Sequence, residues 1–359
     1  MSINKDDYAS NIIECKQSKN SAFELLRIIA MILIIMHHYA YEIYTDYTSP
    51  LSGNLFFLQF FYMFGKLGVN LFVFITGFFL CDKEFKLNKL IRLELLVIFY
   101  SVFFNLIFVF LFHYNLEKSI LFESFFPLIS SKYWFYNTYF VLYLLFPYLN
   151  IFLNCDKKCL LKLIFILLLI WSILPAFPKI HPLEKSNLGW FVLLYFSGAY
   201  IKKYNSDFNH KPVLYISIAF ILICILLFQV FLFDLLGTKN IIFRKKFDYY
   251  QSMNSVFMFS IAALLFISFS KMKFHNNFIN IIGGTTFGVY LIHGHNFVAD
   301  FLWGGVFNFR HKMDEPSLIP FSFMAVLVVF AGCSIIELLR LFINQKIVGL
   351  YNRIKKCSL

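Results

Sequence analysis

The segment Phe23–Tyr44, FELLRIIAMILIIMHHYAYEIY, decides the fold class of this chain. It is an apolar run of spanning length, because an α-helix needs about 20 such residues to cross the hydrocarbon core of a bilayer. Ile, Leu and Met make up most of the run, and Arg27 and His38 stand out among them as strongly polar residues. The segment therefore predicts a membrane-spanning helix.

Further apolar runs follow along the chain, and their composition agrees with that prediction. The chain is 60% hydrophobic and 14% charged, against roughly 45–50% and about 25% in an ordinary soluble domain. This excludes a soluble enzyme, and we predict an all-α, polytopic bundle of about ten transmembrane helices with short loops. The other predicted spans are Phe60–Leu80, Leu90–Phe112, Tyr133–Phe152, Leu160–Phe177, Gly189–Ile201, Val213–Leu236, Met253–Ser270, Phe278–Asp300 and Pro320–Ile343.

The charge distribution predicts the orientation of the bundle. With both chain ends in the cytoplasm, 20 of the 32 Lys and Arg residues fall in inner segments and 10 in outer loops. Cytoplasmic loops carry such an excess for reasons of topology, so the net charge of +12 does not indicate nucleic-acid binding. We predict a cytoplasmic N-terminal segment at 1–21, a transmembrane domain at 22–343 and a basic cytoplasmic tail at 344–359. The short run Gly189–Ile201 is expected to be tilted or extended by its neighbours.

The first span contains residues that lipid should not tolerate. A charged side chain within a span costs roughly 2.5–3.5 kcal/mol even on a mild insertion scale, so each one indicates a partner or a function. His38 follows Arg27 by three helical turns, about 16 Å further along the same face, which suggests a polar path through the bundle. Alternatively, Arg27 snorkels to the inner head groups, and His37 or His38 binds a carbonyl or lies at the outer interface.

A second cationic group begins the third span. Lys89 and Arg92 are one turn apart on one helix face and lie near the same membrane surface as Arg27. Together, the three cations suggest a cup for a polyphosphate such as a nucleotide or coenzyme A. For the neighbouring Lys83 and Lys86, the general excess of inner positive charge is the simpler explanation.

A third polar patch lies in the ninth predicted span. Helical spacing puts His293 near the face of Tyr290 and Asn296, and Asp300 follows. A structural hydrogen-bonding role for His293 is at least as well supported as catalysis. Two His residues separated by one position point to different helix faces, and the chain has no HExxH motif, so we predict no metal site.

The four Trp residues fall toward the outer side of the predicted spans. An interfacial aromatic belt explains this placement. The alternative is that Trp134 or Trp303 stacks on a sugar ring, because the C–H face of a carbohydrate packs well on an indole.

Several segments, taken in order, resemble the membrane acyltransferase-3 family. The first-helix signature of that family is an Arg with a small residue three positions on and a His eleven positions on, met here by Arg27, Ala30 and His38. Lys89 and Thr76 are mild departures from the family pattern. The other similar segments are GVNLFVFITGFFL (Gly68–Leu80), KLIR (Lys89–Arg92), YWFYNTYFVLYLLFPYLN (Tyr133–Asn150) and FGVYLIH (Phe287–His293).

The resemblance implies a ten-helix O-acyltransferase of the bacterial inner membrane. Such an enzyme moves an acyl group, usually acetyl, from cytosolic acetyl-CoA to a carbohydrate hydroxyl of a capsule, an exopolysaccharide or a lipid-linked repeat unit. A glycan flippase, a transporter or a polysaccharide polymerase is the alternative. A clear inverted repeat would favour transport, and a large outer loop would favour polymerisation.

The resemblance also suggests roles for the polar residues. The donor phosphates would be bound by Arg27, Lys89 and Arg92, and His38 would be the catalytic base. A brief acyl-His38 intermediate is the alternative to direct attack, and the adjacent His37 points about 100° away around the helix. The expected acceptor-binding residues are Trp134, Tyr290, His293 and Asp300.

Overall fold

The computed structural model describes residues 20–43, 51–115, 117–130, 132–177, 186–310 and 315–357. Within these ranges the regular secondary structure is entirely helical and there is no strand, which confirms the predicted all-α fold. The predicted N-terminal segment 1–21 lies outside the described residues except for its last two positions. The cytoplasmic location of both chain ends stays a prediction.

Seven helical segments of the described chain are long and apolar enough to cross a membrane. Three predicted spans are not among them: α6 (Trp134–Phe152), α8 (Asn187–Lys203) and the ninth run. A count of ten therefore stays a prediction. The seven are α2 (Ser21–Ile43), α3 (Gly53–Leu80), α4 (Leu87–Phe112), Lys157–Ala176 with α7 (Lys157–Leu168), α9 (Pro212–Gly237), Ile241–Lys271 with α10 (Ile241–Arg244) and α11 (Val256–Lys271), and Leu318–Ile347 within α15 (Leu318–Cys357).

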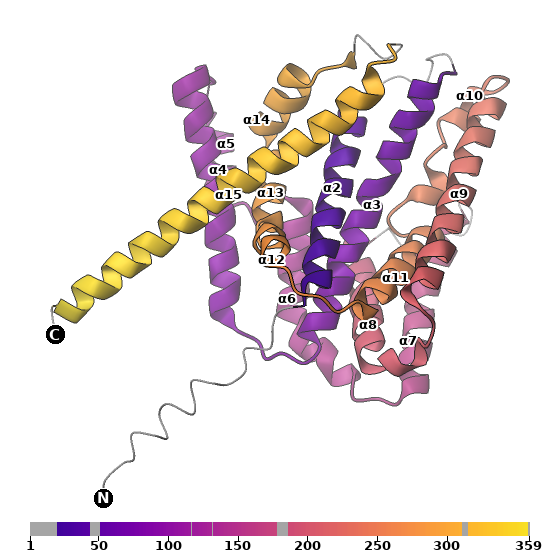
Figure 1. Cartoon of the computed structure of the whole chain (residues 1–359), viewed down its shortest axis with the longest axis horizontal. Coiled ribbons are helices and arrows are strands. Elements are labelled where there is room, and N and C mark those ends of the chain that lie inside the picture. The colour runs from indigo at the N-terminus through magenta and orange to yellow at the C-terminus, as the bar shows by residue number, and fades with distance from the viewer. Residues whose placement is uncertain are drawn as a thin grey trace, which may run out of the picture.

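Hydrogen bonds between helix ends fix the alternating direction of the helices. The start of α2 lies beside the end of α11, the end of α3 beside the end of α6, and the start of α9 beside the end of α11 (Figure 1). This pattern is the alternation that the predicted order of spans requires. The bonds are Asn20 Nδ2 to the Met272 carbonyl at 2.9 Å, Asn150 Nδ2 to the Leu80 carbonyl at 3.1 Å and Ser268 Oγ to the Pro212 carbonyl at 3.1 Å.

Glycines let α3 approach its two main neighbours backbone to backbone. A Cβ added to Gly68 would lie 2.4 Å from the Ala30 carbonyl oxygen of α2, and one added to Gly198 of α8 would lie 2.4 Å from the Phe74 carbonyl oxygen. No side chain fits in either place, because real Cβ atoms essentially never come that close to another heavy atom. The α2–α3 contact therefore holds the polar residues of α2 at a fixed depth in the bundle.

The ninth predicted span, Phe278–Asp300, is not one helix. The chain forms α12 (Asn277–Gly283), α13 (Thr286–His293), α14 (Asn296–Ala299) and a wide helical turn at Asp300–Val306. The first break follows the Gly283–Gly284 pair, where Thr285 Oγ1 donates to the Ile282 carbonyl at 2.7 Å. Gly pairs and such back-bonding hydroxyls are common causes of broken helices. The second break, at Gly294, removes Asn296 from the face that carries His293, so the shared face predicted for these two residues was wrong.

The helix α15 runs obliquely across the bundle, and its C-terminal half projects beyond it on the α4 side (Figure 1). It continues through residue 343, where we expected the span to end, and its 40 residues extend for about 60 Å. Buried Glu337 anchors it, since this carboxylate accepts two bonds of 2.7 Å from Arg340 and one from the Tyr100 hydroxyl of α4. The buried charge is thus paired, which removes most of the cost of placing it there.

Candidate active site

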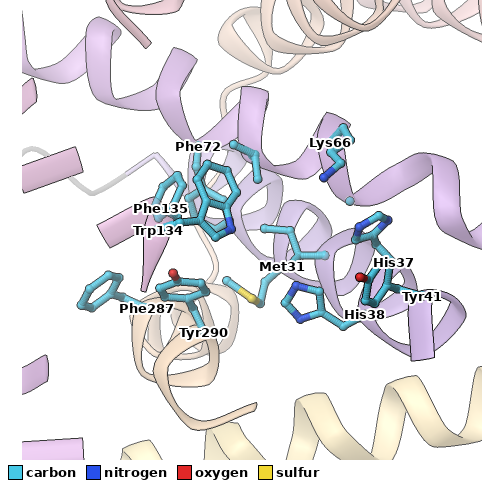
Figure 2. A pocket seen from close by; sticks show the side chains of 13 residues that line it. Met31, His37, His38, Tyr41, Lys66, Phe72, Trp134, Phe135, Phe287 and Tyr290 are labelled. Atoms are coloured by element: carbon cyan, nitrogen blue, oxygen red, sulfur yellow. The ribbon is translucent and has the colours of Figure 1, made fainter. Parts of the chain in front are cut away.

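A cavity of about 450 Å³ opens between α2, α3, α6 and α13, and His38 lies on its wall. Figure 2 shows the α2 and α3 polar groups facing the aromatic residues of α6 and α13 across this space. The polar lining groups are His37, His38, Tyr41, Lys66, Trp134 and Tyr290. The apolar lining groups are Met31, Ile34, Val69, Phe72, Phe135 and Phe287.

The two adjacent histidines of α2 have different surroundings. His37 is buried, and its Nδ1 donates a hydrogen bond of 2.5 Å to the Tyr62 carbonyl of α3. His38 is half-buried, and it makes no hydrogen bond within the described part of the chain. A nitrogen of His38 is therefore available to a molecule in the cavity, whereas His37 is tied to the backbone.

His293 lies behind His38. The centres of the two imidazole rings are 5.1 Å apart, and His293 is fully buried. Its Nδ1 donates a bond of 2.5 Å to the Val289 carbonyl, so the proton of a neutral ring is on Nδ1 and Nε2 carries a lone pair. This buried Nε2 has no hydrogen-bond partner among the described residues. His293 does not line the cavity, so its geometry suits an action through His38.

Trp134 and Tyr290 form the wall opposite His38, as Figure 2 shows. The Trp134 indole is 41% exposed and stands at the mouth of the cavity, while Tyr290 is buried against Phe135 with ring centres 5.6 Å apart. Asp300 is exposed and lies outside the cavity lining. Two of the expected acceptor-binding residues thus line the cavity, His293 lies behind its wall and Asp300 lies elsewhere.

Lys66 lines the same cavity, and the sequence analysis did not single it out. It lies in α3, next to Gly65, and its charge interacts with Asp248. The rule that drew attention to Arg27 would have found it, because Lys66 is also a cation within an apolar run. The cavity therefore brings an ammonium and an unbonded imidazole to the same space.

A family model described as an acyltransferase domain matches residues 20–338 of the chain. The chain belongs to this acyltransferase family. The match confirms the resemblance indicated by the motifs, and it covers every predicted site residue. No curated protein and no solved structure matches the chain.

Arg27 of the acyltransferase is paired, and the sequence analysis did not foresee its partner. The guanidinium forms a salt bridge with Glu24 one turn earlier in α2, and it lies over the Phe79 ring at 5.7 Å from the ring centre. The Glu24 carboxylate is 1% exposed and the Arg27 side chain 27% exposed. The pair reduces the cost of a cation in this position and turns the guanidinium toward the helix start.

Lys89 and Arg92 are exposed at the start of α4. With Lys86 they line a separate hollow of about 390 Å³, and Arg27 is not among the residues that line it. The acyltransferase thus presents three clustered cations at this end of α4, and the predicted cup of Arg27, Lys89 and Arg92 is not a single hollow. In the described ranges, no group of three or more His, Cys, Asp or Glu residues is placed to hold a metal ion.

Proposed function

We propose that this acyltransferase moves an acetyl group from cytosolic acetyl-CoA to a hydroxyl of a cell-surface or lipid-linked glycan, with His38 as the general base. The observation that carries the proposal is the His38 imidazole, which lines a cavity and makes no hydrogen bond to any residue that the structure describes. An imidazole that is neutral near pH 7 is suited to take a proton from a sugar hydroxyl.

His38 alone can carry the proton from the sugar hydroxyl to the departing thiolate. His38 accepts the hydroxyl proton as the sugar oxygen bonds to the thioester carbonyl carbon, and a tetrahedral oxyanion forms. The C–S bond then breaks, the ester remains on the sugar, and the imidazolium returns its proton to the departing thiolate. The Lys66 ammonium is proposed to stabilise the oxyanion, because it lines the same cavity.

His293 is proposed as a positioning residue rather than as an acceptor ligand. A general base needs a lone pair on the nitrogen that faces its substrate, so the proton of neutral His38 must be on the other nitrogen. The unpartnered Nε2 of His293 can accept a hydrogen bond from that N–H. The pair would thus select the reactive tautomer of His38, as outer-shell partners do for metal-bound imidazoles.

The donor is proposed to enter from the end of the bundle that carries Arg27. The apolar lining residues Met31 and Ile34 precede His38 in α2, so they lie on the Arg27 side of the imidazole. An apolar passage suits the acyl group and the pantetheine arm of coenzyme A, whereas its phosphates need cations. We assign the phosphates to Arg27, Lys89 and Arg92, and the acceptor side to Trp134 and Tyr290.

The test is the acetyl content of surface polysaccharide, measured by proton NMR in a host that carries the wild type, His38→Ala, His37→Ala or a deletion at matched membrane levels. We expect acetyl signals to vanish in the deletion and in His38→Ala and to persist in His37→Ala. If the deletion strain keeps every acyl group but no longer exports or lengthens the polysaccharide, the proposal is overturned in favour of a flippase or a polymerase.

A further inference from the structure

A second hollow of about 340 Å³ adjoins the His38 cavity on its outer side. The two share Lys66 and Trp134, which stand at their junction. A third hollow of about 310 Å³ adjoins the second and shares Asp248, Ser252 and Asn254 with it. The three together form one groove that leads away from His38.

The lining changes character along this groove. Six aliphatic or Phe side chains line the His38 cavity, whereas indoles, amides, hydroxyls and a carboxylate line the second hollow. Indole faces pack against sugar C–H groups, and amide and carboxylate oxygens accept bonds from sugar hydroxyls. The indoles, amides and carboxylate that line the second hollow belong to Trp134, Trp171, Trp190, Asn187, Asn254 and Asp248.

An interfacial belt does not explain two of these tryptophans. Trp190 is 1% exposed, and its indole N–H donates to Asn70 Oδ1 of α3 at 2.9 Å. Trp171 is half-buried and packs on α8, where a Cβ on Gly189 would lie 2.4 Å from its ring. Both residues line the hollow, and both rings are held by contacts within the protein.

Polar side chains of the second hollow also interact with other groups of the protein. Asn254 Nδ2 donates to the Trp171 carbonyl at 2.9 Å, and its Oδ1 makes no bond within the described residues. Asp248 interacts electrostatically with Lys66, and both residues line the second hollow, so this hollow carries charges of both signs. A hydroxyl-rich ligand fits such a hollow better than a strongly ionic one.

We propose that the hollow lined by Trp171, Trp190, Asp248 and Asn254 binds the sugars next to the one that is acylated, so the acceptor is an oligosaccharide or a polysaccharide. This inference rests on the proposed function. It adds that recognition extends beyond the reacting sugar, over residues of three separate segments, and that the length of the acceptor chain is a determinant of turnover.

The experiment uses the full-length protein in nanodiscs with [14C]acetyl-CoA. The acceptors are base-deacetylated surface polysaccharide, its size-separated fragments and the constituent single sugars, and the quantity compared is kcat/KM for a fragment divided by kcat/KM for the single sugar. We expect this ratio to exceed one in the wild type and to fall at least about ten-fold in Trp171→Ala, which corresponds to about 1.4 kcal/mol. Trp171→Phe keeps a ring face and should recover part of the ratio. Phe177→Ala, which removes an exposed aromatic outside the groove, should leave the ratio unchanged.

A binding measurement separates this inference from the chemistry. In the His38→Ala background, fragment binding is followed by Trp fluorescence, and we expect Trp171→Ala or Asp248→Asn to weaken it about ten-fold. The inference is overturned if single sugars are acylated as well as fragments, or if Trp171→Ala leaves both the ratio and the binding at wild-type values. If fragments bind in the groove but receive no label from the wild type, the proposed acyl transfer fails while the glycan site stands.

Discussion

The imidazole rings of His38 and His293 lie with their centres 5.1 Å apart, although one belongs to α2 and the other to α13, far apart in the chain. His293 donates through Nδ1 to its own helix, so its Nε2, which has no partner among the described residues, is left as a hydrogen-bond acceptor in a buried site. A buried acceptor without a partner is costly, and a neighbouring N–H donor relieves that cost. This relationship supports the proposal that His293 selects the tautomer of His38.

Replacing His293 with Phe tests this role. The change keeps a ring of similar size and removes the acceptor, and we expect kcat to fall about 10–100-fold with little change in the KM for acetyl-CoA. His293→Gln restores an acceptor oxygen and should regain part of kcat. Steady-state kinetics at matched protein levels measures both, and a change in KM alone would contradict a positioning role.

Lys66 gives a second kinetic test. If its ammonium stabilises the oxyanion, Lys66→Met should lower kcat by about 10²-fold, whereas Lys66→Arg, which keeps the charge, should lower it less. The comparison is made at saturating donor and acceptor, so that weaker binding does not account for the loss. A Lys66→Met enzyme with wild-type kcat would remove Lys66 from the mechanism.

The sequence predicts those parts of this fold that depend on apolar length alone. The runs that became α2, α4 and α9 agree with the predicted spans to within a few residues, because long apolar segments have no other stable place than a bilayer. The breaks at Gly284 and Gly294 were not predicted. The Gly283–Gly284 pair and the Thr285 hydroxyl at the first break are visible in the sequence, but a count of apolar residues does not register them.

The sequence also predicted part of the candidate site, namely single residues but not their neighbours. The rule that intramembrane polar residues indicate function found His38, and applied evenly it would have found Lys66. The rule did not say which residues would lie beside these polar side chains. That Glu24 pairs with Arg27, and that His293 lies behind His38, became known only from the three-dimensional contacts. The groove that leads away from His38 was harder still to predict, because Trp171, Trp190 and Asn254 come from segments whose proximity no spacing in the sequence indicates.

An ion pair outside the spans predicts a small pH effect on stability. Lys202 donates to Asp82, which follows the end of α3, and this bond lowers the pKa of the Asp82 carboxyl below its ordinary value. A depressed pKa contributes stability above the unfolded value of about 3.9, and the contribution is lost as pH falls through the folded pKa. The pair is largely exposed, so Asp82→Asn should cost less than about 1 kcal/mol at pH 7.

Thermal unfolding of the purified protein at two pH values measures that effect. The gap in Tm between wild type and Asp82→Asn should be present at pH 7, and it should shrink as the pH falls below about 4 toward the folded pKa of Asp82. A gap that grows on acidification would have the wrong sign for this mechanism.

The α2–α3 contact provides the last test, since it connects packing to the position of His38. A Cβ at Gly68 would lie 2.4 Å from the Ala30 carbonyl oxygen, and backbone cannot move aside as the end of a flexible side chain can. Gly68→Ala should therefore force the two helices apart, at a cost of about 1–3 kcal/mol in the free energy of unfolding.

The matched control is Gly332→Ala in α15, where an added Cβ meets nothing within 4 Å. We expect Gly332→Ala to keep the wild-type Tm and acetyl transfer, and Gly68→Ala to lower both. Transfer should fall even at temperatures where Gly68→Ala remains folded, because a shift of α2 against α3 moves His38 relative to Lys66 in the cavity wall. If Gly68→Ala lowers Tm but transfers acetyl at the wild-type rate well below its Tm, the close contact holds the fold together without setting the geometry of the site.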